Sequence, residues 1–223
     1  MKVLALETAT AACSVALWDD GRVVSRFVAA SRGHAELLAP MIAEVLAEAG
    51  IAAADLDRLA VTVGPGAFTG LRVGLAAARG LALATGRPLL GLTSFEVIAH
   101  GLPAEERAGR ALLVAVDSRR AELFLQRYDA ALTAVGEPAV LTPEDCAGWL
   151  PTGPLVIAGD GAPLLRAALA GRADTAFAAG AGLPEAAVLA RLAAALAPGA
   201  GLPPRPLYLR APDALLPGGV APS

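Results

Sequence analysis

Apolar positions follow two patterns along the first hundred residues of this chain. Short continuous apolar runs are typical of buried strands, whereas apolar residues that recur every three or four positions are typical of an amphipathic helix. The patterns predict three strands, a helix, a strand, a helix and a strand, in that order. The expected elements are strands 3–6, 12–18 and 22–30, helix 33–50, strand 59–63, helix 69–85 and strand 88–92.

The same order of features starts again after a polar segment, 101–110, which we interpret as a linker. Residues 113–118 read Leu-Val-Ala-Val-Asp-Ser and echo residues 3–8, which read Val-Leu-Ala-Leu-Glu-Thr. A strand, an acid, a hydroxyl, a tight turn and a second strand open each half, as in duplicated ribonuclease H-like domains of the actin and hexokinase type. We therefore predict an α/β fold with two ribonuclease H-like halves, 1–100 and 111–223. The second half is reduced and ends in an extended tail.

Further elements are expected in the second half of the chain. The pattern predicts strands 121–128, 133–141 and 155–158, helices 163–169 and 184–196, a loose segment 171–182 and a last ordered segment 204–210.

The glycine-rich stretch 64–74 joins strand 59–63 to the following helix, for which Thr69 is a plausible N-cap. One interpretation is a phosphate cradle, because a glycine turn before a helix N-terminus attracts anions. A Walker A loop would require Lys and then Ser or Thr after the last glycine, and Leu71 and Arg72 stand there instead. The other interpretation is a tight turn that lets another backbone approach closely, and we favour it.

Composition and charge narrow the classes of function. The chain is 56% hydrophobic and 17% charged, and its 223 residues are enough for one large domain or two small ones. The net charge of −3 and the lack of a basic patch predict weak binding of nucleic acid by the chain alone. Arg72, Arg79 and Arg87 interrupt the most apolar region, so no membrane span is expected. The N-terminus shows no signal-peptide pattern, which favours a cytoplasmic location.

Candidate chemistry centres on the two acid-hydroxyl pairs, Glu7-Thr8 and Asp117-Ser118. If the halves face each other across a cleft, these groups could bind nucleotide phosphates or a metal near its floor. The alternative is that each acid caps a strand end by accepting hydrogen bonds from turn amides. Neither hairpin contains the glycine that usually lets a phosphate reach backbone N–H groups.

Metal and nucleophile chemistry is not expected. His34 opens a helix, and Leu38 occupies the position where a second metal ligand would stand. Cys13 and Cys146 are far apart in sequence, and we interpret them as buried free thiols of a reducing cytoplasm. We therefore predict no catalytic residue and no metal site.

Residues 4–17 and 64–74 together resemble the TsaB (YeaZ) family of bacterial proteins. The resemblance covers most of 1–99 and weakens after Gly109. Family members are required for threonylcarbamoyladenosine synthesis in tRNA and are non-catalytic paralogues of TsaD, the transferase. TsaD holds a metal with two histidines on its first long helix, where this chain has His34 and Leu38. The chain also has Glu7 where Asp is more usual.

The resemblance implies a set of partners. TsaD is expected as the partner in a heterodimer, TsaE joins them, and tRNA is reached only through the complex. The resemblance implies no intrinsic cofactor, with ATP or ADP placed at the complex interface, and a homodimer when TsaD is not present.

Helices 33–50 and 69–85 are predicted to form the partner surface, because a row of small residues allows close helix packing. The predicted contacts are Leu37, Met41, Gly70, Gly74, Ala77 and Leu81.

Two other classes of function are open at this level. One is an enzyme in its own right, either an actin-like ATPase or a metalloprotease-like protein, which would carry a metal or turn over ATP. The other is a homodimeric binding protein of unrelated role.

Overall fold

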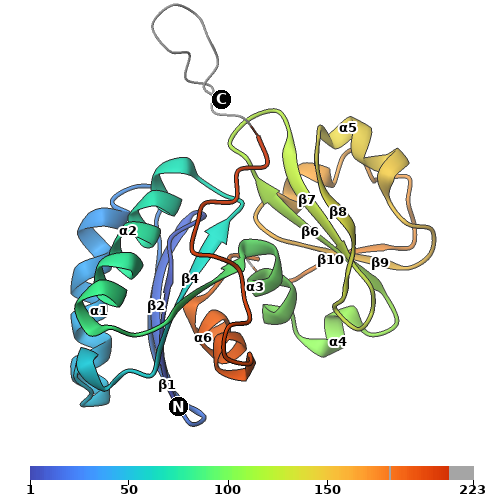
Figure 1. Ribbon diagram of the computed structural model, residues 1–223. Coiled ribbons are helices and arrows are strands. Elements are labelled where there is room, and N and C mark those ends of the chain that lie inside the picture. The colour runs from blue at the N-terminus through green and yellow to red at the C-terminus, as the bar shows by residue number, and fades with distance from the viewer. Residues whose placement is uncertain (181, 211–223) are drawn as a thin grey trace, which may run out of the picture.

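The structure is a computed structural model that describes residues 1–180 and 182–210, and within them each half carries one five-stranded sheet (Figure 1). The first sheet has the order β3-β2-β1-β4-β5. Its first three strands are antiparallel, and β4 and β5 continue in parallel from β1. The strands are β1 (Lys2–Glu7), β2 (Ala12–Asp19), β3 (Arg22–Ala29), β4 (Arg58–Gly64) and β5 (Leu89–Thr93).

The second sheet repeats the first in strand order and in strand direction. Its order is β8-β7-β6-β9-β10, with antiparallel β6, β7 and β8 and parallel β6, β9 and β10. The strands are β6 (Ala111–Asp117), β7 (Leu123–Tyr128), β8 (Ala134–Leu141), β9 (Leu155–Ala158) and β10 (Thr175–Phe177). The short echo between 3–8 and 113–118 therefore marks a duplicated architecture, and the predicted fold class is confirmed.

Two long helices cover one face of the first sheet, and a helix from the other end of the chain covers the opposite face. α1 (His34–Ala49) and α2 (Phe68–Thr85) bury Leu38, Met41 and Leu75 against that sheet. α6 (Ala186–Ala195) packs on its other face through Leu189 and Ala193, although it belongs to the second half of the sequence.

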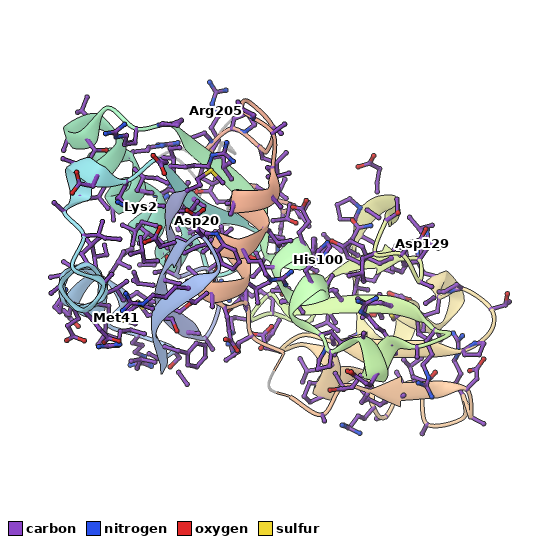
Figure 2. The ribbon with its side chains drawn as sticks, turned by 90° about the horizontal axis from the view of Figure 1, so that it is seen from below. Lys2, Asp20, Met41, His100, Asp129 and Arg205 are labelled. Carbon is purple, nitrogen blue, oxygen red and sulfur yellow. The ribbon has the colours of Figure 1, made fainter. Side chains whose placement is uncertain are left out.

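α3 (Ser94–Gly101) belongs to the first half of the sequence but packs against the second sheet, through Phe95 and Ile98. The predicted linker 101–110 contains a short helix, α4 (Ala104–Arg107). Arg191 of α6 donates a hydrogen bond to the carbonyl of His100 (3.1 Å), which lies where the two halves meet (Figure 2). The halves are thus interlocked by helices that the division into 1–100 and 111–223 separates.

Two helices begin at capping threonines, and three local predictions are wrong. Thr93 and Glu96 form a capping box at the start of α3, and Thr142 caps α5 (Pro143–Cys146). α2 begins at Phe68, with Ala67 rather than Thr69 at the N-cap. The predicted helix 163–169 is a short 3₁₀ turn, Ala162–Leu165, and the segment predicted to be loose contains β10. β10 exists because β9 offers it a parallel partner, which is tertiary context rather than local preference.

The tail up to residue 210 is ordered, as predicted, and runs as a strap across both halves (Figure 1). Leu202 exchanges two backbone hydrogen bonds with Gly91 on β5, each 2.8 Å long. Further on, Leu207 packs against the core of the first half and Leu209 against that of the second. Arg210 then forms an ion pair with Glu122 (3.1 Å). Among the described helices, none is long and apolar enough to cross a membrane.

Candidate functional site

The glycine-rich stretch 64–74 closes over the turn between β1 and β2. Ala67 N donates to the carbonyl of Ala9 (2.6 Å), and Thr8 Oγ1 donates to the carbonyl of Gly70 (2.7 Å). A Cβ at Gly66 would lie 2.0 Å from Ala9 O, and one at Gly70 would lie 2.1 Å from Thr8 O. Only glycine permits this approach. The stretch is therefore a tight turn packed on the chain's own backbone, and backbone occupies the space that a phosphate cradle would need.

Glu7 is sealed beneath this turn. Its side chain is fully buried, and Oε1 accepts a hydrogen bond from Ala9 N (2.6 Å). Within the described residues, Oε2 and the nearby Thr62 Oγ1 are buried without a hydrogen bond of normal geometry. Burial raises the pKa of Glu7 to about 8, against smaller lowering effects from Thr62 and from the N–H groups of Ala9 and Thr10. Glu7 is therefore mostly protonated at neutral pH, and a neutral sealed carboxyl is a poor ligand for a metal or its water.

The second acid, Asp117, also bonds its own turn. Asp117 Oδ1 accepts from Arg119 N (2.7 Å), and Ser118 Oγ donates to the carbonyl of Glu122. Arg119 pairs with Asp117 (3.0 Å) and with Asp160 (3.5 Å), whose Oδ1 accepts from Asp117 N (2.9 Å). Both acids thus cap strand ends, which is the less specialised of the two roles considered from the sequence.

The sequence analysis did not predict a role for Asp160, although its position between two glycines points to it. It lies between Gly159 and Gly161, directly after the fourth strand of its half. Gly64-Pro65-Gly66 occupies the same place in the first half, and the φ angles of Gly64 and Gly159 are +106° and +108°. Extending the internal comparison to the fourth strand of each half would have aligned these turns and pointed to Asp160.

A cleft of about 710 Å³ opens between the halves beside these turns. It is lined by Ser118 and by the first turns of α1 and α2, whereas Glu7 and Asp117 are not among its lining residues. His34, at the start of α1, is buried with Nε2 3.2 Å from Thr10 O and 3.1 Å from Ala12 O, so it ties the helix to the turn. Basic side chains on the lining come from Arg32, Arg119, Arg120 and Arg210.

The described residues contain no group of three or more His, Cys, Asp or Glu side chains arranged to hold a metal ion. Cys13 and Cys146 are buried free thiols, as predicted. Burial raises the pKa of each thiol to about 11, so neither is an activated nucleophile.

Comparison with known proteins places this architecture in a family. The model of the TsaD family, described as tRNA N6-adenosine threonylcarbamoyltransferase, matches residues 28–197. The solved structure of YeaZ from Pseudomonas aeruginosa is 34% identical, with a TM-score of 0.81 over 93% of this chain and 99% of that chain. The chain belongs to the TsaD family, in its TsaB (YeaZ) branch.

Curated TsaB relatives agree with this assignment over part of their length. The tRNA threonylcarbamoyladenosine biosynthesis protein TsaB of Escherichia coli is 39% identical over 148 residues, which are 65% of this chain and 64% of that protein. TsaB of Haemophilus influenzae is 35% identical over 127 residues, 57% of this chain and 53% of that protein. The matched region therefore spans less than two thirds of either relative.

Half of the predicted partner contacts on this TsaB fold are not on its surface. Met41, on α1 in the first half (Figure 2), is 5% exposed in the core. Gly70 and Gly74 are buried, and a Cβ at Gly74 would lie 2.4 Å from Thr8 Oγ1. This burial contradicts the predicted placement of both glycines on an exposed helix face. The physical reason is that these glycines let α2 approach the β1–β2 turn of its own subunit. Leu37, Ala77 and Leu81 are partly buried against the same core and stay predictions.

Proposed function

We propose that this chain is a non-catalytic subunit in the synthesis of threonylcarbamoyladenosine in tRNA, where it binds and supports TsaD. The names of its TsaB relatives support the part of this proposal that concerns threonylcarbamoyladenosine synthesis. The observation that carries the non-catalytic role is the closed turn. The backbone of Thr8 and Ala9 fills the corner beneath Gly66 and Gly70, and the neutral carboxyl of Glu7 is sealed behind it.

The proposed assembly is a heterodimer with TsaD, which TsaE joins, and which reaches tRNA only as a complex. ATP or ADP is assigned to the interface between subunits rather than to this chain alone. The same surface supports a homodimer when TsaD is not present, because TsaB and TsaD share the family's helices.

The exposed faces of α1 and α2 are the proposed contact surface for TsaD. Leu83 on α2 is 88% exposed, which is unusual for a leucine on a well-packed helix. Small residues recur every four positions around it and on the neighbouring helix, where side chains would not hinder close packing. They are Ala76, Gly80 and Ala84 on α2 and Ala35, Ala39, Ala43 and Ala47 on α1, all exposed. The idea of close helix packing is thus kept, with these exposed residues in place of the buried Met41, Gly70 and Gly74.

Leu83→Glu is expected to abolish co-elution with TsaD in size-exclusion chromatography, while leaving the circular dichroism spectrum unchanged. A charge placed in the centre of a packed helix contact must be desolvated without a partner, which costs several kcal/mol. Leu164→Glu is the matched control, because Leu164 is also exposed (49%) but lies in the second half of the chain. The surface is assigned wrongly if the Leu83 variant co-elutes with TsaD as fully as the control.

The purified chain is expected to carry no stoichiometric metal and to hydrolyse no ATP. The reasons are the sealed Glu7, the turn-capping Asp117 and the engaged Nε2 of His34. Elemental analysis and a coupled ATPase assay check this prediction. Zinc or iron at one equivalent, or ATP turnover that survives a second purification step, would favour the enzyme class instead.

A further inference from the structure

Arg58, the first residue of β4, carries a buried positive charge without an acidic partner in the described part of the chain. The residue is only 7% exposed. Nη1 donates to the carbonyls of Ala193 (2.5 Å) and Leu196 (2.9 Å) at the C-terminal end of α6. No Asp or Glu among residues 1–180 and 182–210 forms an ion pair with it.

The contact with the C-terminal end of α6 compensates only part of the buried charge of Arg58. A helix C-terminus offers about half an elementary negative charge, so it stabilises the guanidinium without neutralising it. Burying a charge that lacks a full counter-charge is costly, which is why buried arginines are usually paired with an acid.

The opposite edge of the guanidinium remains available for binding. Nε and Nη2 make no hydrogen bond with any described residue. Neither nitrogen is among the described side-chain atoms that are both sealed and without a partner, so each keeps some exposed surface, and Arg58 lines a cavity. Nε–H and Nη2–H point in parallel, and this edge is the one that binds a carboxylate through two hydrogen bonds.

The cavity that Arg58 lines has a volume of about 320 Å³ and mostly apolar walls. Prolines contribute no N–H groups, and Leu202 N and Ala200 N already donate to Gly91 O and Ala197 O. Arg58 is the charged side chain among the residues that line this cavity. The lining residues, besides Arg58, are Pro88, Leu89, Leu90, Pro198, Gly199, Ala200, Gly201, Leu202, Pro203 and Pro204.

We propose that this cavity is a binding site for a carboxylate with a small apolar body, held by the Nε–Nη2 edge of Arg58. One planar edge in an apolar wall matches the two oxygens of a carboxylate, whereas a phosphate would leave further charged oxygens against proline and leucine. The carboxylate can belong to a free small acid or to the C-terminus of an apolar peptide, because both present the same group. The site lies outside the inter-half cleft, since the two sets of lining residues do not overlap.

The test is a titration of the full chain with butyrate, followed by the amide signals of Gly199, Gly201 and Leu90 in ¹H–¹⁵N spectra. We expect saturable shifts with a dissociation constant on the order of 1 mM, which is reasonable for so small a ligand. Butyramide, which has the same shape and no charge, should bind at least about tenfold more weakly. An acetylated Ala-Leu-Val peptide and its C-terminal amide, titrated in the same way, distinguish a peptide terminus from a free acid.

Arg58→Lys keeps the charge and removes the two-donor edge, so it should weaken butyrate binding at least about tenfold. Arg87→Lys is the matched control, because Arg87 also donates to a backbone carbonyl, that of Ala54 (2.6 Å), but does not line the cavity. Ala200→Phe should block binding by filling the cavity, while the hydrogen bonds from Arg58 to α6 stay intact. This second variant tests the site even if Arg58→Lys does not fold. The proposal is wrong if neither butyrate nor the free-acid peptide shifts these signals at about 50 mM. It is also wrong if folded Arg58→Lys binds as tightly as the unaltered chain.

Discussion

Gly70→Ala is expected to lower the free energy of unfolding by on the order of 3 kcal/mol. The added Cβ would lie 2.1 Å from the carbonyl oxygen of Thr8, a backbone atom that cannot rotate away. Relief of this clash requires α2 to move off the β1–β2 turn, which also lengthens the 2.7 Å hydrogen bond from Thr8 Oγ1 to Gly70 O. Urea denaturation followed by circular dichroism measures the effect.

Gly80→Ala, in the same helix, is the matched control for this experiment. A Cβ at Gly80 would meet nothing within 4 Å, and alanine is the better helix former by up to about 1 kcal/mol. We therefore expect Gly80→Ala to be neutral or stabilising. Equal effects of the two substitutions would mean that α2 does not pack on the turn as closely as the structure shows. A bulky residue at Gly74 could not test the partner surface, because its Cβ would lie 2.4 Å from Thr8 Oγ1 within the same subunit.

Stability is expected to fall as the pH rises from about 5 to about 8, and Glu7→Gln is expected to remove much of this slope. The pKa of Glu7 is about 8 in the folded chain, against an ordinary value of 4.5. Below pH 4.5 both the folded and unfolded states hold the proton, so Glu7 carries no penalty. Between the two values only the unfolded state releases it, which costs the folded state up to roughly 1.4 kcal/mol per pH unit. Above pH 8 the contribution of Glu7 becomes constant.

Glutamine is a close mimic of the protonated carboxyl, because it has the same shape, no charge and a donor that can face Thr62 Oγ1. The free energy of unfolding at pH 5, 6, 7 and 8, from urea titrations, gives the slope for each protein. Glu137→Gln is the control, because Glu137 is exposed and its replacement should leave the slope unchanged. If Glu7→Gln keeps the full slope of the unaltered chain, Glu7 is not held in its neutral form.

Much of the first half could be predicted from sequence, because its elements are locally encoded. Apolar runs in the sequence mark β1, β2 and β4. α1 begins after Gly33 and ends before Gly50, and α3 begins with the capping box of Thr93 and Glu96. The two uninterrupted motifs, 4–17 and 64–74, also sufficed for the family, which the comparisons confirm. The second half was harder, because β10 is only Thr175–Phe177 and is stabilised as a strand by pairing with β9.

The sequence by itself determined the duplicated fold, the family and the requirement for glycine at the turn 64–70. Each of these rests on local patterns or on motifs that are continuous along the chain. Only the tertiary structure decided which face of α2 is buried, because two faces of that helix carry small residues and helical spacing cannot rank them. It also decided that α6 covers the first sheet, that Glu7 is sealed and that Arg58 lines a cavity. Burial, and with it the pKa of an acid or the cost of a charge, depends on neighbours brought together from distant parts of the chain, and local spacing does not encode them.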